Sequence, residues 1–131
     1  MLEVLPIESK AEQERLCALC GAEYLPDDLA YSARADGALA GVCQFRTGPG
    51  GGILHTLDVI PGFEDFEPGF VMCRAAMSFI EMCGGEYAVA SAALAQKSRA
   101  LLSAAGFKQT KDGLPAAYLP GLFEHPCSSG K

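Results

Sequence analysis

Residues 30–61 read AYSARADGALAGVCQFRTGPGGGILHTLDVIP, and this stretch predicts three consecutive β-strands. Between its first two apolar runs lies Asp36-Gly37, a dipeptide that is among the strongest short signals for a tight hairpin turn. The glycine-rich segment 48–52 predicts a second turn, and the strand after it, 53–60, ends before a proline. We therefore expect three antiparallel strands here, joined by turns.

The segment before this stretch and the one after it each predict a helix. A strand at 2–7 precedes a capping-box pattern, Ser9 followed by Glu12, which opens a helix that ends at Gly21. A second, mostly apolar helix is expected at 68–83, with a proline at a position that a helix start tolerates. Its polar residues form one narrow stripe of Arg74, Ser78 and Glu81.

The C-terminal part predicts three more strands and one more helix. The apolar segment 87–92 has the character of a central strand that is covered on both faces. A helix follows and ends at Gly106, and strands are expected at 107–110 and 116–123. The order βα, βββ, αβ, αββ predicts an α/β fold, a mixed sheet with helices on both faces. The apolar face of the last helix consists of Leu94, Leu101, Leu102 and Ala105.

Length and charge restrict the class of protein. With 131 residues, half of them hydrophobic, we expect a single domain at 1–126 and a C-terminal tail at 127–131. The net charge is -6 and the 10 basic residues form no run, which argues against nucleic acid and anionic membranes as partners. The N-terminal residues do not have the pattern of a signal peptide, so a cytoplasmic protein is expected.

Four short motifs stand in order along the chain. They are Asp36-Gly37-x-Leu39-x-Gly41, Leu57-x-Val59-x-Pro61, Gly69 at the start of the long helix, and Gly106-Phe107 after the next helix. Together with the order of elements, they resemble the GNAT superfamily of acyl-CoA N-acyltransferases. The resemblance covers about residues 2–123 and implies a GNAT-type, mostly antiparallel sheet of six to seven strands.

The resemblance also implies where acetyl-CoA, as co-substrate, would bind. The sheet would splay between the strands 53–60 and 87–92, with backbone groups of 57–59 pairing with the pantetheine arm. The loop before the long helix would hold the pyrophosphate, because N–H groups at a helix N-terminus favour phosphate. An amine would then attack the thioester directly. The implied cofactor-binding residues are Leu57, Asp58, Val59, Phe66, Gly69, Phe70 and Val71.

The pyrophosphate loop departs from the GNAT pattern Gln/Arg-x-x-Gly-x-Gly/Ala. Here the stretch 64–69 reads EDFEPG, so that Glu64 replaces the usual Arg or Gln and Glu67 replaces the first glycine. Pro68 contributes no N–H. Carboxylates beside a pyrophosphate repel it, and we hypothesise that Glu64, Asp65 or Glu67 itself occupies the helix N-terminus in place of the phosphate.

The catalytic groups of the superfamily are only partly present. Where many members have an Asn at the start of the second helix and a Tyr near its end, this chain has Ala95 and Leu102, so the usual general acid is missing. Two residues of the strand 53–60 are candidate catalytic groups. His55 is a candidate base, because histidine titrates near neutral pH, and Asp58 is a candidate base or counter-ion to a cationic amine.

Other patterns have simpler explanations. Cys17-x-x-Cys20 has the spacing of a metal or redox motif, but no second pair accompanies it, and buried thiols are the expected outcome. The segment 48–52 lacks the Lys-Ser/Thr of a phosphate loop. A divalent-cation site is an open alternative, and its ligands would be Asp58, Glu64, Asp65 and Glu67.

Two functions follow from the sequence. The first is an acetyl-CoA-dependent N-acetyltransferase that acts on an amine of a small molecule or protein, without a metal ion. The second is a GNAT-fold binding or regulatory module that no longer turns over acyl-CoA, as a homodimer or beside a partner. An active enzyme should have a gap beside Val59 with the N–H groups of residues 69–71 pointing into it, whereas an inactive module should have that space filled by Phe66 or by the carboxylates.

Overall fold

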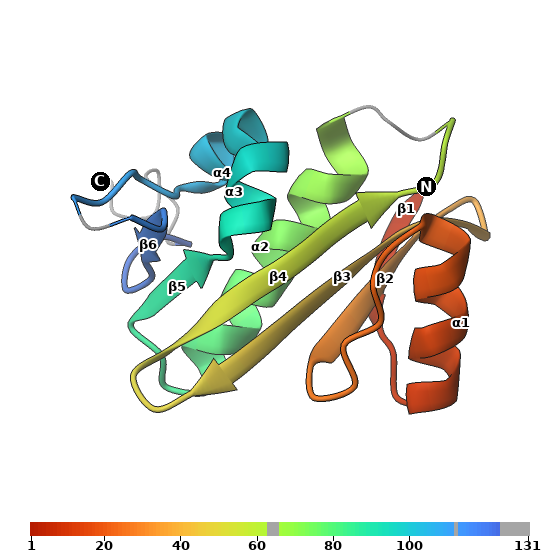
Figure 1. Ribbon diagram of the computed structural model, residues 1–131, viewed down its shortest axis with the longest axis horizontal. Helices are drawn as coiled ribbons and strands as arrows, with labels where there is room; N and C mark the ends of the chain where they lie inside the picture. Colours follow the sequence, from red (N-terminus) through yellow and green to blue (C-terminus); the bar gives the residue numbers. More distant parts are fainter. Residues whose placement is uncertain (63–65, 112, 124–131) are drawn as a thin grey trace.

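The computed structural model describes residues 1–62, 66–111 and 113–123. The predicted alternation of strands and helices is confirmed (Figure 1). In chain order the elements are β1 (Leu2–Pro6), α1 (Lys10–Cys20), β2 (Leu29–Ala35), β3 (Ala38–Gly48), β4 (Gly51–Val59), α2 (Phe66–Met82), β5 (Tyr87–Ala90), α3 (Ala92–Lys97), α4 (Arg99–Ala105) and β6 (Ala116–Tyr118).

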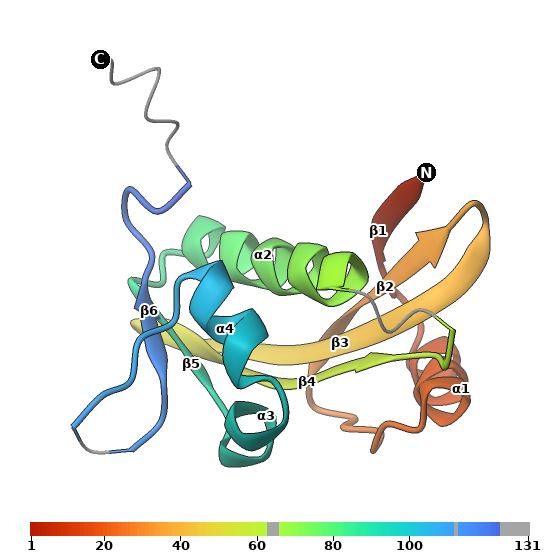
Figure 2. The same ribbon diagram turned by 90° about the horizontal axis from the view of Figure 1, so that it is seen from above.

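The strands form one six-stranded sheet in the order β1-β2-β3-β4-β5-β6. Neighbouring strands are antiparallel except for β4 and β5, which run parallel. The chain reaches β5 from β4 through α2, the crossover that a parallel pair requires. Helices cover both faces, since α2 and α4 lie on one side of the sheet and α1 and α3 on the other (Figure 2).

Local signals account for the first helix and the first hairpin. Ser9 caps α1 by accepting a hydrogen bond from the Glu12 amide at 3.2 Å, and Gly21 ends it in the left-handed conformation. The reciprocal half of the capping box is not formed, because the Glu12 carboxylate binds Arg15 instead. Asp36 and Gly37 both have positive φ, 52° and 86°, as a two-residue hairpin turn requires.

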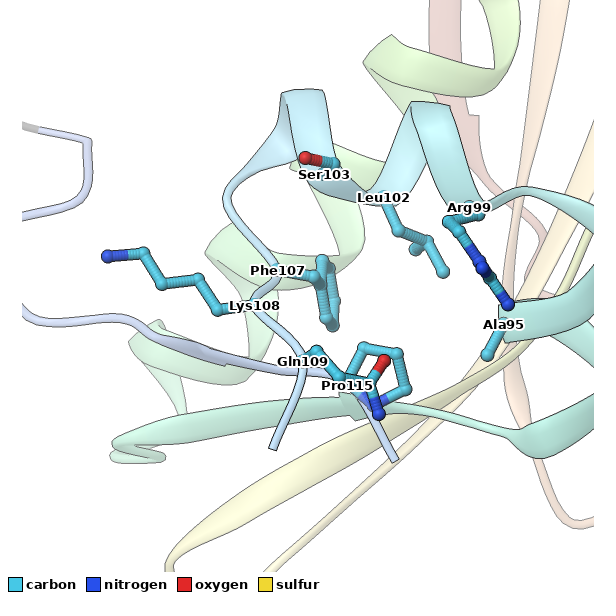
Figure 3. Close-up of a pocket in the computed structure, with 8 residues that line it drawn as sticks. All are labelled: Ala95, Arg99, Leu102, Ser103, Phe107, Lys108, Gln109 and Pro115. Atoms are coloured by element: carbon cyan, nitrogen blue, oxygen red, sulfur yellow. The ribbon is translucent and has the colours of Figure 1, made fainter. Parts of the chain in front are cut away.

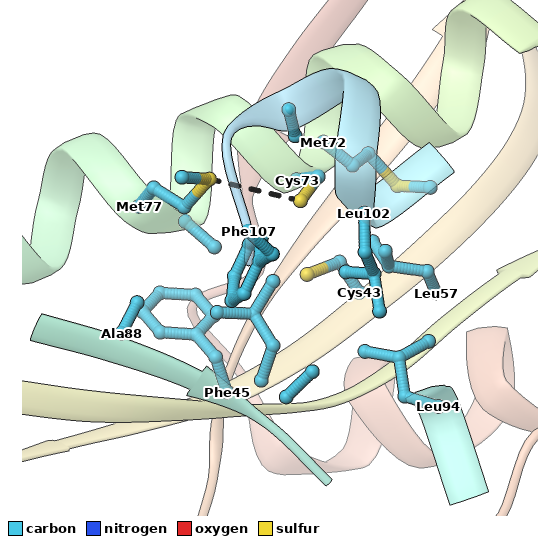
Figure 4. Packing of buried hydrophobic residues seen from close by; sticks show 14 of the residues in the cluster. Cys43, Phe45, Leu57, Met72, Cys73, Met77, Ala88, Leu94, Leu102 and Phe107 are labelled. Atoms are coloured by element: carbon cyan, nitrogen blue, oxygen red, sulfur yellow. Dashed lines mark hydrogen bonds between the residues drawn. The ribbon is translucent and has the colours of Figure 1, made fainter. Parts of the chain in front are cut away.

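The main hydrophobic core lies between the sheet and the helices α2 and α4. It combines β3, β4 and β5 side chains with α2 and α4 side chains, among them Phe45, Leu54, Met77 and Leu102, each at most 1% exposed (Figure 4). A smaller cluster around Cys17, Cys20 and Val42 lies under α1. The core is thus concentrated on one face, which leaves the α1 face free for polar groups.

Four details of the prediction are corrected. The helix expected to end at Gly106 is broken at Ser98, because α3 packs on β4 while α4 packs on α2. The expected strand 107–110 forms only a single bridge between Lys108 and Ala116, and the last strand is short. The strand β5 is not covered on both faces, since Tyr87 is half exposed.

None of the helices in the described parts of the chain is long and apolar enough to cross a membrane.

Candidate functional site

The strands β4 and β5 separate halfway along β4. Their parallel pairing runs from Gly51 with Tyr87 to Leu54 with Ala90. The Ser91 amide donates to the Leu54 carbonyl at 2.9 Å, and the chain then turns away into α3. The second half of β4 therefore continues without β5 beside it.

A β-bulge lies at the point of separation. On β3, Phe45 faces Leu54 and Gln44 faces Thr56, so His55 is the extra residue of β4. After the bulge, the Ile60 amide donates to Ala40 of β3 at 2.8 Å. Because alternate residues of a strand direct their N–H and C=O groups to opposite edges, Leu57 and Val59 present theirs to the side that β5 has left.

A groove of about 690 Å³ follows this open strand edge. Its walls come from β4, from the start of α2, from the end of α1, and from the junction of α3 and α4. Of the residues predicted to bind acetyl-CoA, Leu57, Asp58, Val59, Phe66 and Gly69 line this groove. The gap beside Val59 is thus present, and half-exposed Phe66 forms part of its wall.

The predicted residues Phe70 and Val71 do not line the groove, because α2 begins two residues earlier than expected, at Phe66. In an α-helix the amide of residue i bonds to the carbonyl of residue i−4, so the amides of 70 and 71 are used within α2. Instead, the Phe70 ring stacks on Phe66 at a centroid distance of 5.4 Å, and the Arg74 guanidinium lies 5.7 Å from the Phe70 ring.

Among the described residues, the N-terminus of α2 presents few backbone donors. The free amides of its first turn are those of Phe66 and Glu67, because Pro68 has none. Glu67 places a carboxylate in that turn. Glu64 and Asp65 lie outside the described residues, so the hypothesis that they occupy this N-terminus stays a prediction.

Gly69 has a packing role in addition to its place in the groove. A Cβ atom at this position would lie 2.7 Å from Cδ1 of Leu101 on α4. The glycine therefore allows the first turn of α2 to approach α4 closely, and this contact positions the two helical walls of the groove.

Two cationic side chains form part of the groove wall. Lys97 and Arg99 line the groove from the junction of α3 and α4. Arg99 also lines a second cavity of about 460 Å³, whose apolar side is formed by Leu102, Phe107 and Pro115 (Figure 3). Arg99 is therefore shared between the linings of the two hollows.

The candidate residue Asp58 is engaged in an ion pair. Its carboxylate, 11% exposed, binds the ammonium group of Lys97. Lys97 belongs to α3 and Asp58 to β4, so this pair bridges the opening between the two elements. The assignment of Asp58 as a catalytic group stays a prediction.

The candidate base His55 contacts a buried carboxylate. Its Nδ1 atom lies 2.5 Å from Oδ2 of Asp28, and Asp28 is fully buried. The other carboxylate oxygen, Oδ1, accepts from Nε and Nη2 of Arg46 at 3.1 and 3.0 Å. His55, 23% exposed, also lines a hollow of about 110 Å³ that shares Leu57, Asp58 and Lys97 with the groove.

A second polar group is buried on the same α1 face. Gln44 is inaccessible to solvent, and its Oε1 accepts from Nε2 of Gln13 and from the Leu25 amide, both at 2.9 Å. Its Nε2 donates to the Glu23 carbonyl at 2.7 Å. These bonds fasten the α1–β2 connection, which carries Asp28, to the sheet.

Sequence reasoning missed Asp28, Arg46, Gln13 and Gln44. A partial signal was available, because polar residues at 44 and 46 alternate with apolar ones on a predicted strand. Such alternation is typical of a solvated face, and it does not reveal that a loop covers that face.

The expected lack of the usual acid is consistent with the surroundings of the substituted positions. Leu102 is buried in the core, and Ala95 lies at the second cavity. Tyr87 and Tyr118 contact each other on β5 and β6, with 5.2 Å between their ring centroids. Neither tyrosine lines the groove.

The remaining patterns are explained by packing. Burial is the main cause that raises the pKa of both Cys17 and Cys20 to about 11, so these thiols are protonated at neutral pH. Gly48 and Gly51 pair across a two-residue turn, which confirms the hairpin. Among the described residues, no group of three or more His, Cys, Asp or Glu side chains could hold a metal ion; Glu64 and Asp65 of the predicted cation site lie outside them.

Comparison with known proteins identifies the fold. No family model and no curated protein sequence matches the chain. Among solved structures, an IAA acetyltransferase from Bacillus cereus superposes with a TM-score of 0.71 at 16% identity, covering 91% of this chain and 100% of that one. The PaiA N-acetyltransferase from Thermoplasma acidophilum, in complex with coenzyme A, gives 0.70 at 15% identity, covering 90% and 99%.

A third structural neighbour is described as a GNAT family protein. It is a GNAT family acetyltransferase from Elizabethkingia anophelis with acetyl-CoA bound, with a TM-score of 0.67 at 12% identity and coverage of 90% and 98%. At sequence identities of 12% to 16%, the similarity to these structures concerns the fold alone. The fold predicted from the four motifs is confirmed.

Proposed function

We propose that this chain, which has the GNAT fold, binds acetyl-CoA in the groove beside β4 and transfers the acetyl group to an amine. The observation that carries the proposal is the strand edge at 57–59, whose backbone groups face the groove because β5 ends beside Leu54. A pantetheine arm carries amide groups, and an unpaired strand edge offers both donors and acceptors to them.

The residues of the groove fit the two ends of acetyl-CoA differently. Leu57 and Val59 would hold the pantetheine arm through their backbone groups. Arg99 lines the groove and supplies a cation for phosphate, whereas the carboxylate of Glu67, in the first turn of α2, repels it. We therefore expect binding with an affinity reduced by Glu67, and phosphate recognition that depends on α4 more than on the start of α2.

His55 is the group that would accept the proton of the amine. It stands at the bulge where β4 and β5 separate, and its hollow adjoins the groove. Bound acetyl-CoA supplies a thioester carbonyl that the amine attacks. His55 would hold the released proton, and solvent would protonate the leaving thiolate, because Ala95 and Leu102 cannot do so.

The acceptor and the setting are part of the proposal. A net charge of -6 favours a cationic amine of a small molecule or a protein over an anionic partner. We propose that the protein is cytoplasmic and that it binds neither nucleic acid nor membranes. A homodimer would complete an acceptor site that the short α1–β2 connection leaves shallow.

A binding or regulatory module is the second candidate, and the sequence at the start of α2 favours it. Glu67 and Pro68 remove most of the phosphate-binding capacity of that turn. Such a module would keep the groove for acyl-CoA or another ligand and would catalyse no transfer.

Two measurements on the purified chain separate these functions. Thermal unfolding with and without millimolar acetyl-CoA tests binding, since ligand at 100 times its Kd adds about 2.7 kcal/mol of stability, a shift of several degrees. Release of free CoA thiol is then followed with a panel of primary alkylamines, polyamines, amino acids and peptides with a free N-terminus. Binding with amine-dependent thiol release supports the enzyme. Binding without thiol release supports the module. If acetyl-CoA causes no thermal shift, neither the enzyme nor an acyl-CoA-binding module is supported.

A further inference from the structure

We propose that Asp28 and Arg46 form a positioning pair that fixes the proton on Nδ1 of His55 and so leaves Nε2 as the basic nitrogen of the site. The inference rests on the proposed function, because it concerns the residues that would prepare His55 to act as the base. The observation behind it is the buried carboxylate of Asp28, which the packing of the fold does not explain.

Asp28 is costly to bury in this position. It is fully inaccessible to solvent, and burying a carboxylate is unfavourable unless the charge is paired and hydrogen-bonded. Both of its oxygens are used, Oδ1 by Arg46 and Oδ2 by His55. Arg46 carries a permanent positive charge, so Oδ1 lies in an ion pair and Oδ2 is left to accept from His55.

An ionised carboxylate selects one tautomer of histidine. Oδ2 has no hydrogen to donate, so the contact at 2.5 Å requires a hydrogen on Nδ1 of His55. In the neutral ring the other nitrogen, Nε2, then carries a lone pair. A histidine that is to accept a proton from an amine needs this free lone pair.

Three separate parts of the chain maintain this arrangement. The bulge places the His55 backbone at the end of the β4–β5 pairing, where Ser91 Oγ donates to the His55 carbonyl at 3.2 Å. The Asp28 backbone is held by its own turn, since its amide donates to Leu25 at 3.0 Å, and by Lys10, whose ammonium group donates to the Asp28 carbonyl. The backbone of His55 and the backbone of its carboxylate partner are thus both held in place.

The location of the His55 ring explains what the Asp28–Arg46 pair would do for the reaction. The 110 Å³ hollow that His55 lines shares three residues with the proposed acyl-CoA groove. A base in this place can reach a nucleophile next to a thioester bound along 57–59. Asp28 and Arg46 line neither hollow, which makes them positioning residues that act through His55.

The first test is a direct reading of the tautomer in the wild-type protein. Nitrogen-15 NMR of the histidine rings, recorded from about pH 6 to pH 10, covers the titration range of an imidazole. A His55→Ala variant assigns the signals, because the chain has only 2 histidines. We expect Nδ1 protonated and Nε2 unprotonated at the high-pH limit. The opposite tautomer, or a mixture of the two, overturns the proposal.

The second test changes the carboxylate alone. In Asp28→Asn the side-chain amide can donate to Nδ1, so we expect the tautomer to reverse, with kcat for amine acetylation at least 10-fold lower and KM for acetyl-CoA within about twofold of wild type. The exposed neighbour Asp27→Asn is the matched control and should change neither quantity. If Asp28→Asn keeps the wild-type tautomer and kcat, the proposal is wrong.

The outcomes remain separable from those of the proposed function. If Asp28→Asn does not fold, Arg46→Gln, which leaves both His55 and Asp28 in place, should lower kcat without lowering acetyl-CoA affinity more than about twofold. A wild-type chain that binds no acetyl-CoA contradicts the proposed function, whereas the NMR result still decides whether Asp28 sets the tautomer of His55.

Discussion

The carboxylate of Asp28 and the imidazole of His55 lie 2.5 Å apart although 27 residues separate them in sequence. Asp28 belongs to the connection between α1 and β2, and His55 is the bulged residue of β4. The contact therefore forms only when that connection folds over the sheet. A buried polar network around Gln44 holds the connection in this position, and the first prediction concerns it.

Replacing Gln44 should destabilise the fold strongly. In Gln44→Leu the Leu25 amide and the Glu23 carbonyl lose the Gln44 side chain as their partner, and Nε2 of Gln13 keeps only the Leu25 carbonyl. Each buried unsatisfied group costs about 1–3 kcal/mol, so we expect a loss of about 2–5 kcal/mol in the free energy of unfolding. Urea denaturation measures it. The exposed Gln96→Leu is the control and should stay within about 0.5 kcal/mol of wild type.

The charges of the groove should control affinity for CoA in opposite directions. Glu67→Gln removes a repulsive carboxylate and should tighten binding, and Arg99→Gln removes a cation and should weaken it. One unit charge at about 4 Å in water corresponds to about 1 kcal/mol, or roughly fivefold in Kd. Titration calorimetry at low and high salt measures both changes, which should shrink as salt increases.

The exposed Glu14→Gln on α1 has the same change in charge and controls for net charge. Equal effects of Glu14→Gln and Glu67→Gln would show that no phosphate binds near the start of α2.

Two glycines should differ in their tolerance of alanine. A Cβ at Gly41 would lie 2.7 Å from the backbone oxygen of Asp58, which cannot move without disturbing β4. A Cβ at Gly69 would meet only the end of the Leu101 side chain, which can rotate. We expect Gly41→Ala to cost about 1–3 kcal/mol and Gly69→Ala less than about 1 kcal/mol in denaturant unfolding. A larger loss for Gly69→Ala than for Gly41→Ala would contradict the close approach of Gly41 to the backbone of β4.

Stability should fall as the pH rises above 9. Burial raises the pKa of Cys17 and Cys20 from 9.0 to about 11, so between these values the unfolded chain loses protons that the folded chain retains. The unfolded state then binds fewer protons, and the free energy of unfolding decreases with pH. Urea denaturation at several pH values measures the slope.

The double variant Cys17→Ala/Cys20→Ala should show a shallower slope. Some slope should remain, because burial also raises the pKa of Cys73, to about 12, and that of Cys43. An unchanged slope would mean that the two thiols of α1 ionise equally in the folded and unfolded states.

Much of the fold could be predicted because its signals are local. Ser9 and Gly21 delimit α1, and Asp36-Gly37 fixes the hairpin register, each through the conformation of a few residues. The break at Ser98 has no local signal such as proline. It follows from the different packing partners of α3 and α4, and tertiary packing of this kind does not leave a pattern in a single sequence.

The candidate site was predictable only in part, for the same reason. The residues of β4 share one strand, so that finding the strand also finds Leu57 and Val59. Asp28 and Arg46 come from other elements, and only the folded chain brings them to His55. The positions of Phe70 and Val71 depend on where α2 begins, and helix starts are among the least certain features of a sequence.

Binding of acyl-CoA along the open half of β4 can be measured by an amide NMR titration of the labelled chain with CoA. We expect saturable shifts of the Leu57 and Val59 amides, whereas amides of β1 and β2 stay unchanged. If millimolar CoA leaves the Leu57 and Val59 amides unshifted, or shifts only residues away from the groove, acyl-CoA does not bind at this strand edge.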